Sequence, residues 1–254
     1  MSRPIGQDDC FAGASRDVAP VSVIPSVLIH KTPIPFQKDM YEKDKSEKFV
    51  NKNWTILMTV NNAYLDFFQN WIHFYNKLQV NYPMIIIAED DVAFLRLRQI
   101  NGKPRFTPVR SWRISLGSAV VYGSKGFKEL ASGRPTYILR YLEKGTNILY
   151  ADTDSVWLHD PAPFFQGQYD MWMQVDSPGN LCTGLMAIKS NNESIKLMKK
   201  WEASLKTRLD IDQTAFNKVH RNSTIHLKPL DRNLFPSGNL YFGHHMYMSC
   251  VERS

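Results

Sequence analysis

The sequence predicts an α/β fold in which a mixed, mainly parallel β-sheet is flanked by helices. Apolar runs of strand length alternate with stretches whose apolar residues recur at helical intervals. Two of these runs, at 54–60 and 83–88, are apolar almost throughout, which is typical of strands covered on both faces. A strand, a helix and a second such strand in succession indicate parallel pairing. We therefore expect a single α/β domain.

Composition supports a globular chain without a nucleic-acid partner. Of the 254 residues, 43% are hydrophobic and 22% are charged, which leaves enough apolar surface to build a core. The net charge is +7, but Lys and Arg are scattered, and the densest group, at 196–208, has the spacing of a solvated helix face. No run approaches the roughly 18 consecutive apolar residues of a membrane span, and the N-terminus does not resemble a signal peptide.

The N-terminal part of the chain is expected to differ from the rest. Residues 1–50 combine several prolines with a stretch crowded by charged residues, and we expect a disordered or irregular tail or linker there. The folded domain is expected over 51–254, opening with strands at 54–60 and 83–88. The helix between these strands is predicted by apolar residues at helical spacing, namely Leu65, Phe68, Ile72, Tyr75 and Leu78.

Glycine and proline residues mark the element boundaries in the middle of the chain. Residues 89–123 have little periodicity and are expected to form loops. A helix is expected over 127–143, with a break or a fresh start at Gly133 and Pro135 and a stop at Gly145.

A third strand is expected at 147–151, and ligands in such folds bind beyond the C-terminal ends of the strands. Further strands are expected at 171–175, 185–188 and 224–227, and helices at 193–205 and 212–219.

An acidic pair, Asp152 and Asp154, follows the third expected strand directly. In an extended chain the side chains at i and i+2 point to the same side, so the two carboxylates can converge on one cation. Hard oxygen ligands favour Mg²⁺ or Mn²⁺, which keep positions open for water and phosphate oxygens. The spacing alone is weak evidence, because Asp210 and Asp212 repeat it, and a turn or loop cap is the alternative.

The same residues also fit a phosphatase motif. Haloacid-dehalogenase-type phosphatases carry D-x-D-x-[TV] after a strand, with the first Asp as covalent nucleophile, and Asp152 to Val156 match that wording. That family normally carries the motif near the start of its domain and a later acidic pair for Mg²⁺. Here about 100 residues of expected domain precede the motif. The phosphatase therefore remains an alternative.

Five motifs resemble those of another family over a longer stretch. They occur in the same order as in that family, at 127–139, 147–161, 182–186, 212–217 and 230–238. The chain resembles the nucleotide-diphospho-sugar transferase family, which includes plant α-1,3-xylosyltransferases of rhamnogalacturonan assembly and their animal relatives. The resemblance implies a GT-A-like, Rossmann-type domain and a retaining glycosyltransferase. It also implies a UDP-sugar donor, with UDP-xylose as one candidate, and a hydroxyl of a glycan or glycoprotein as acceptor.

The resemblance assigns the donor phosphates to three residues. Asp152 and Asp154 are expected to hold Mn²⁺ or Mg²⁺ against the diphosphate, where the cation stabilises the departing UDP. Arg134 occupies the family's basic position, where a cation offsets phosphate charge. A surface salt bridge is the alternative for Arg134.

The sugar is assigned to the later motifs. Asp212 and Gln213 are expected beside the anomeric carbon, to stabilise an oxocarbenium-like transition state or to orient hydroxyls. Whether either residue forms a covalent bond stays open, and Asp212 as a helix cap is the alternative. Thr183 and Gly184 are expected where the sugar approaches the backbone closely, or else in an ordinary strand-entry turn. Asp176 is expected to contact donor or acceptor hydroxyls, or to be a loop aspartate.

Two features depart from the family's pattern. The third metal ligand is usually a histidine beyond the Phe-Pro-Ser-Gly segment, and the surroundings of His244 and His245 do not match it. We expect this ligand to be missing and the domain to be truncated at its C-terminus. The family's transmembrane anchor, which faces the Golgi lumen, is also not found in this sequence. A shortened, inactive member that binds only nucleotide or a partner is therefore a third alternative.

Overall fold

The computed structural model describes residues 54–102, 104–113, 117–238 and 240. The expected N-terminal tail, 1–50, lies outside the described residues, as do His244 and His245. Within the described residues, no helix is long and apolar enough to cross a bilayer.

The first half of the sheet consists of three parallel strands. Strand β1 (Thr55–Val60) pairs with β2 (Met84–Ala88), and β2 pairs with β3 (Thr107–Arg110). Helix α1 (Leu65–Lys77) connects β1 to β2, and helix α2 (Asp91–Gln99) connects β2 to β3. The two strands and the helix expected before residue 89 are confirmed.

The second half continues the sheet. A short helix α3 (Lys125–Ala131) precedes α4 (Arg134–Leu142), and β4 (Ile148–Ala151) pairs parallel with β1 on the side opposite β2. The remaining elements are β5 (Met171–Ser177), β6 (Asn180–Ile188), α5 (Asn192–Thr207), α6 (Asp212–His220) and β7 (Leu227–Pro229).

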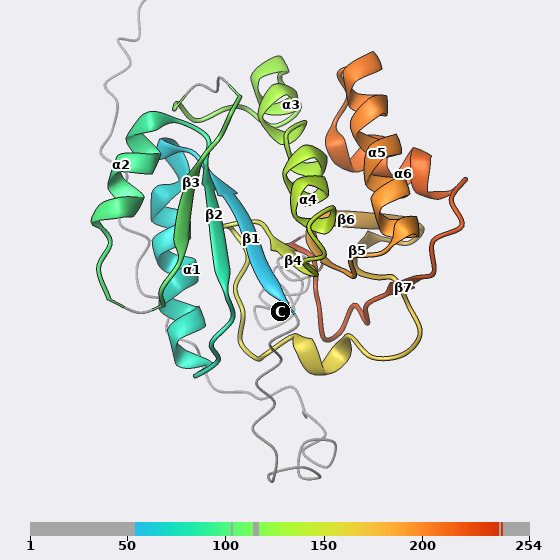
Figure 1. The fold of residues 1–254 in the computed structure, drawn as a ribbon, viewed down its shortest axis with the longest axis horizontal. Helices are drawn as coiled ribbons and strands as arrows, with labels where there is room; N and C mark the ends of the chain where they lie inside the picture. The colour runs from blue at the N-terminus through green and yellow to red at the C-terminus, as the bar shows by residue number, and fades with distance from the viewer. Residues whose placement is uncertain (1–53, 103, 114–116, 239, 241–254) are drawn as a thin grey trace, which may run out of the picture. The chain divides into compact units, whose positions relative to one another are not determined.

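Among the described residues, seven strands lie in the order β3-β2-β1-β4-β6-β5-β7, and of these only β6 runs antiparallel to its neighbours (Figure 1). Two apolar clusters fill the two faces of the sheet. One joins β1 and β2 to α1 and α2, and the other joins the sheet to α4, α5 and α6. The mixed, mainly parallel sheet flanked by helices is confirmed. Strands β1 to β4 end at the same edge, where a ligand is expected in this fold class.

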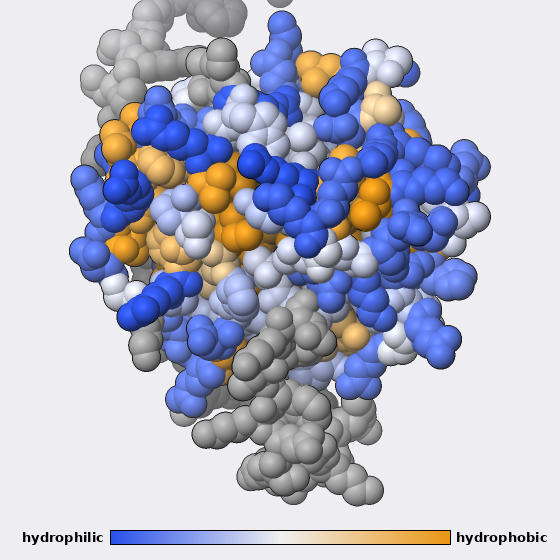
Figure 2. Space-filling view, in the orientation of Figure 1, coloured by the Kyte–Doolittle hydropathy of each residue, from blue (hydrophilic) through white to orange (hydrophobic). Residues whose placement is uncertain are grey.

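Helix α5 confirms the prediction of a solvated basic face. Its lysines are exposed, and two of them form ion pairs, Lys199 with Glu143 and Lys206 with Glu202. The surface over α5 and α6, on the right of Figure 2, is largely hydrophilic. The described lysines of this helix therefore form a solvated face, as the helical spacing predicted.

Three regions differ from the sequence prediction. The last strand was expected at 224–227, but β7 spans Leu227–Pro229. Residues 89–123 were expected to form loops, yet they contain α2 and β3. Asp90 caps α2 by accepting a hydrogen bond from the Ala93 amide, a start signal that the weak apolar periodicity of the helix concealed. Strands β5 and β6 are longer than expected because they form a hairpin that turns at Gly179, whose φ is +80°.

Candidate active site

Arg134 is placed at the sheet edge by a break between two helices. Helix α3 ends at Ala131 and α4 begins at Arg134, with Pro135 in its first turn. Gly133 occupies the junction, because a Cβ there would lie 2.7 Å from the Tyr137 ring and 2.8 Å from a guanidinium nitrogen of Arg113. The expected break at Gly133 and Pro135 is confirmed, and it aims Arg134 at the end of β4.

The Arg134 guanidinium joins three elements of the fold. One terminal nitrogen donates to Asp212 of α6 and to Oγ1 of Thr183 on β6, the latter at 2.7 Å. The other donates to both carboxylate oxygens of Asp152, at 2.7 and 3.0 Å. The group also lies over the ring of Tyr150, 4.9 Å from its centroid. Only 12% of the Arg134 side chain is exposed, so this is no surface salt bridge.

Negative charge exceeds positive charge around Arg134. Burial alone would lower the pKa of Arg134, but the carboxylates of Asp152 and Asp212 hold it well above its ordinary value. Burial also raises the pKa of Asp152; Arg134 offsets part of that rise, whereas Asp154 and Asp212 add to it. One permanent cation therefore faces three carboxylates.

Asp212 opens helix α6 but does not cap it. The capping position is Ile211, which makes no side-chain hydrogen bond to the helix. The Asp212 carboxylate, 3% exposed, instead accepts from Arg134 and from the Thr183 hydroxyl at 3.0 Å. The Trp201 indole donates to the Asp212 carbonyl at 2.9 Å and anchors the start of the helix to α5. The helix-cap alternative is therefore wrong.

Thr183 and Gly184 lie inside β6 rather than in a turn at its entry. A Cβ on Gly184 would lie 2.8 Å from Oδ2 of Asp152, so the open side of this glycine is already filled by a carboxylate. The backbone amide of Asp152 also donates to the Gly184 carbonyl at 2.8 Å. Within the described residues, Gly184 makes room for Asp152, and the expected gap for a sugar at this Cα is not observed.

Helix α6 takes the place of a strand beside β6. Strand β4 pairs with β6 only as far as Leu185, and beyond it, among the described residues, only the Gly184 carbonyl is bonded to the chain that follows β4, through the Asp152 amide. Asn217 bonds two backbone groups earlier in β6, accepting from the Leu181 amide at 3.0 Å and donating to its carbonyl at 2.9 Å. Gln213, one helical turn earlier, accepts from the Thr183 amide at 3.3 Å. The sequence analysis missed Asn217, although its four-residue spacing from Gln213 is a helical signal.

Asp176 completes the network from β5. It lies within that strand, not in a loop after it, and its carboxylate accepts from the Gln213 amide nitrogen at 3.3 Å. Ser237 donates to the Asp176 carbonyl at 3.1 Å, and Gln174 donates to the Pro236 carbonyl at 2.8 Å. The Phe-Pro-Ser segment is thereby held against the end of β5, beside the other predicted site residues.

Asp154 differs from the sequence prediction in its conformation. The Ser155 amide donates to the Asp152 carbonyl at 3.2 Å, so residues 152–155 form a turn and are not extended. The reason given for convergence of the two carboxylates was therefore wrong. Asp154 is exposed, and among the described residues no hydrogen bond or ion pair engages its carboxylate. It still lies close enough to Asp152 to raise the pKa of that residue.

The carboxylates fit a divalent cation as part of its coordination shell. They are hard oxygen donors, and the excess negative charge around Arg134 is what a cation would neutralise. Among the described residues, however, no group of three His, Cys, Asp or Glu side chains is close enough to hold a metal ion. A cation at Asp152 and Asp154 would therefore depend on water and substrate oxygens for its other ligands.

A second polar cluster follows the neighbouring strands and fixes the start of α4. The Tyr137 hydroxyl donates to the carboxylate of Glu89, which is 4% exposed, at 2.8 Å and lies 2.7 Å from the Ser111 hydroxyl. Arg113 donates to Ser132 at 2.7 Å. These residues come from the ends of β2 and β3, so both halves of the sheet position Arg134. Sequence analysis missed the cluster because α2 and β3 were not expected.

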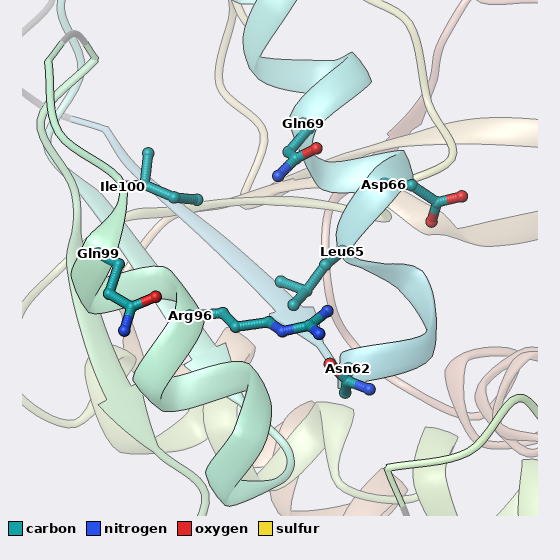
Figure 3. Close-up of a pocket in the computed structure, with 7 residues that line it drawn as sticks. All are labelled: Asn62, Leu65, Asp66, Gln69, Arg96, Gln99 and Ile100. Carbon is teal, nitrogen blue, oxygen red and sulfur yellow. The ribbon is translucent and has the colours of Figure 1, made fainter.

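A groove lies apart from this network, between α1 and α2. Its cavity has a volume of about 590 Å³, and Arg96 extends across it toward Asn62 (Figure 3). The other lining residues are Leu65, Asp66, Gln69, Gln99 and Ile100. None of the predicted site residues lines this groove.

Comparisons with known proteins agree with the motif order. The family model described as nucleotide-diphospho-sugar transferase matches residues 80–252. UDP-D-xylose:L-fucose alpha-1,3-D-xylosyltransferase 3 of Arabidopsis thaliana is 30% identical over 233 residues, covering 80% of this chain and 60% of the relative. The UDP-galactose:fucoside alpha-3-galactosyltransferase of Dictyostelium discoideum is 25% identical over 253 residues, covering 78% of this chain and 39% of the relative. The chain thus spans well under two thirds of these relatives.

Solved structures share the fold. The glycosyltransferase GlyE of Streptococcus pneumoniae TIGR4 superposes with a TM-score of 0.53 at 13% identity, covering 77% of this chain and 49% of that one. The likeness confirms the GT-A-like α/β fold.

Proposed function

Because the chain belongs to the nucleotide-diphospho-sugar transferase family, we propose that it is a metal-dependent, retaining glycosyltransferase. It moves a sugar from a UDP-sugar to a hydroxyl of a glycan or glycoprotein. One observation supports this most: Arg134 joins Asp152, Thr183 and Asp212 at the ligand edge of the sheet. Four sequence motifs, spread over 78 positions of the chain from Arg134 to Asp212, thus meet at one buried guanidinium.

The names of the relatives guide the choice of donor and acceptor. One relative is named for UDP-D-xylose and another for UDP-galactose, and both names include fucose or a fucoside. UDP-xylose is the first donor in this proposal, and a fucosylated glycan is the first acceptor to test. The family's setting also makes the Golgi lumen the proposed location.

Asp152 and Asp154 are the residues that would hold Mn²⁺ or Mg²⁺. Such a cation neutralises negative charge on the departing diphosphate. Asp154, exposed and unpaired among the described residues, is free to ligate without breaking a contact. Asp152 is shared with Arg134, whose permanent charge would lie beside the same phosphates when the donor is bound.

Asp212 and Gln213 support the sugar end of the reaction. The Asp212 carboxylate is almost fully buried, and a negative charge at such a place stabilises positive charge that develops at an anomeric carbon. Gln213 is held by the Thr183 amide at one end of its side chain and by Asp176 at the other, so its amide is oriented before substrate arrives.

The phosphatase alternative has less support. A nucleophilic Asp152 needs a carboxylate oxygen open to phosphorus, yet both oxygens accept from Arg134 and one also accepts from Tyr150 at 3.1 Å. The matching family is also a transferase family. An inactive member that only binds nucleotide is the remaining alternative, and turnover distinguishes it.

The experiment is a donor screen with the purified chain and Mn²⁺. UDP-xylose and UDP-galactose are incubated with and without L-fucose, and released UDP and glycosylated product are measured. We expect UDP release that is lost in Asp212→Asn and kept in Asp66→Asn, a control at an exposed site on α1. A product with inverted anomeric configuration would overturn retention. UDP binding without any turnover would leave the inactive alternative, and phosphate release from an aryl phosphate would favour the phosphatase.

A further inference from the structure

Both terminal nitrogens of Arg134 are engaged in the structure, which bears on how a cation can reach Asp152. Its two terminal nitrogens donate to Asp152, Thr183 and Asp212. One nitrogen donates to both oxygens of Asp152, at 2.7 and 3.0 Å, so the two oxygens that could hold a cation are already engaged. Arg134 thus already supplies the positive charge that Asp152 would otherwise draw from a metal ion.

A divalent cation bound to Asp152 and the Arg134 guanidinium would repel each other. Two positive groups that share the Asp152 carboxylate, whose side chain is 33% exposed while that of Arg134 is 12% exposed, interact through a medium of lower dielectric than water. Asp154 is the only one of the three site carboxylates that no described group pairs with. One carboxylate and water give a weak metal site, since no three-ligand group exists among the described residues.

One donor of Arg134 is left over. Its Nε is buried and finds no acceptor among the described residues. A buried guanidinium nitrogen without a partner costs free energy, so an additional acceptor near Arg134 would be favoured. A diphosphate carries such oxygens, and guanidinium groups bind phosphate well.

We propose that Arg134 and the divalent cation compete for Asp152, so that this chain binds the cation tightly only together with the donor diphosphate. The diphosphate supplies acceptors that draw Arg134 away from Asp152 and oxygens that complete the coordination of the cation. Metal and nucleotide affinities are then coupled through one side chain. The inference rests on the proposed function, because it places the diphosphate at Asp152 and Asp154.

The test is a calorimetric titration of Mn²⁺ alone, without nucleotide, into three proteins. Wild type is expected to bind weakly. Arg134→Gln is expected to bind at least about tenfold tighter, because it removes the competing charge from Asp152. The matched control is Arg140→Gln, which removes an exposed positive charge from the same helix, six residues away, and is expected to behave as wild type.

Loss of Arg134 leaves Asp212 buried without its cation, and the single variant can fail to fold. Arg134→Gln/Asp212→Asn removes both charges and is the second variant, again expected to bind Mn²⁺ more tightly than wild type. A second titration adds UDP. Wild type is expected to gain Mn²⁺ affinity strongly with UDP, and the Arg134 variants to gain much less.

The outcomes separate the inference from the proposed function. If both Arg134 variants fold and bind Mn²⁺ alone no more tightly than wild type, competition for Asp152 is refuted. If UDP does not raise the Mn²⁺ affinity of wild type, the coupling of the two affinities is refuted. UDP binding is measured in the same titration. If wild type does not bind UDP at all, the proposed function is refuted and not only the coupling. An Arg140→Gln gain equal to that of Arg134→Gln would mean that net charge, not the Asp152 contact, sets the affinity.

Discussion

Gly184→Ala tests whether Asp152 is placed by the backbone of β6. The added Cβ would lie 2.8 Å from Oδ2 of Asp152, about 0.6 Å closer than the 3.4 Å at which ordinary contact begins. The carboxylate cannot simply turn away, because Arg134 and Tyr150 hold it and its own backbone amide is bonded to Gly184. Overpacking of this kind costs about 1–3 kcal/mol of unfolding free energy.

Function should suffer more than stability. Displacing a group in a catalytic site by 1 Å costs on the order of a hundredfold in rate, so a shift of about half that predicts a loss of about tenfold. The assays are urea unfolding and UDP release from the donor identified by the screen. Gly126→Ala, on α3 and away from the network, is the control. Its Cβ would lie 3.2 Å from a Val120 methyl group and farther from every other neighbouring atom, so it should change stability by less than about 1 kcal/mol.

A double-mutant cycle identifies the cause. Asp152→Ala removes the atom that the new Cβ would meet, so Gly184→Ala in that background should cost less than about 0.5 kcal/mol. An equal cost of Gly184→Ala in both backgrounds would refute the reasoning, since the strain would then arise elsewhere in β6.

Three further perturbations follow from the same contacts. Tyr150→Phe removes the hydroxyl that donates to Asp152 at 3.1 Å and should cost about 1 kcal/mol in urea unfolding. Asn217→Ala leaves two backbone groups of Leu181 unpaired and should cost about 2–4 kcal/mol, whereas Asn222→Ala, at an exposed position, should cost less than about 0.5 kcal/mol. Burial raises the pKa of Glu89 above its ordinary 4.5, so the folded chain keeps this proton longer than the unfolded chain. The free energy of unfolding should therefore fall as pH rises from the unfolded-state pKa of Glu89, about 4.5, through its higher pKa in the folded chain. Unfolding experiments at stepped pH should show this fall in wild type and not in Glu89→Gln.

The N-terminal half of the fold was predictable where apolar periodicity and the Gly and Pro residues indicated the same element boundaries. Strands β1, β2 and β4 were expected from apolar runs, and the break before α4 from Gly133 and Pro135. Helix α2 was missed because only Ala93 and Leu97 are buried along it, so too few apolar positions mark its inner face. The N-cap residue of α2, Asp90, was present, but no apolar periodicity after it indicated a helix.

The sequence predicted which residues form the candidate site, but not how they contact one another. Motif order named Arg134, Asp152 and Asp212, and the structure brings them into one network. No sequence rule specifies that Arg134 bonds both carboxylates, because that contact depends on how α4 and α6 pack on the sheet. Asn217 was overlooked for a related reason: its role requires that β6 extend past β4, a property of the sheet and not of the local sequence.

Gly184 shows the same dependence on tertiary structure. A glycine in a Thr-Gly step suggested space for a ligand, but the space is used by Asp152. Only the position of the neighbouring β4 end decides which group approaches a bare Cα.

The central claim is that Asp152 and Asp154 form a metal-dependent UDP site. Calorimetric titration of the full chain with UDP, with and without Mn²⁺, tests it most directly, alongside Asp152→Asn/Asp154→Asn and an Asp66→Asn control on α1. The account predicts UDP binding that requires Mn²⁺, persists in the control and vanishes in the double variant while that variant remains folded. Wild type that binds no UDP in the presence of Mn²⁺, or a double variant that binds it as well as wild type, would contradict the account.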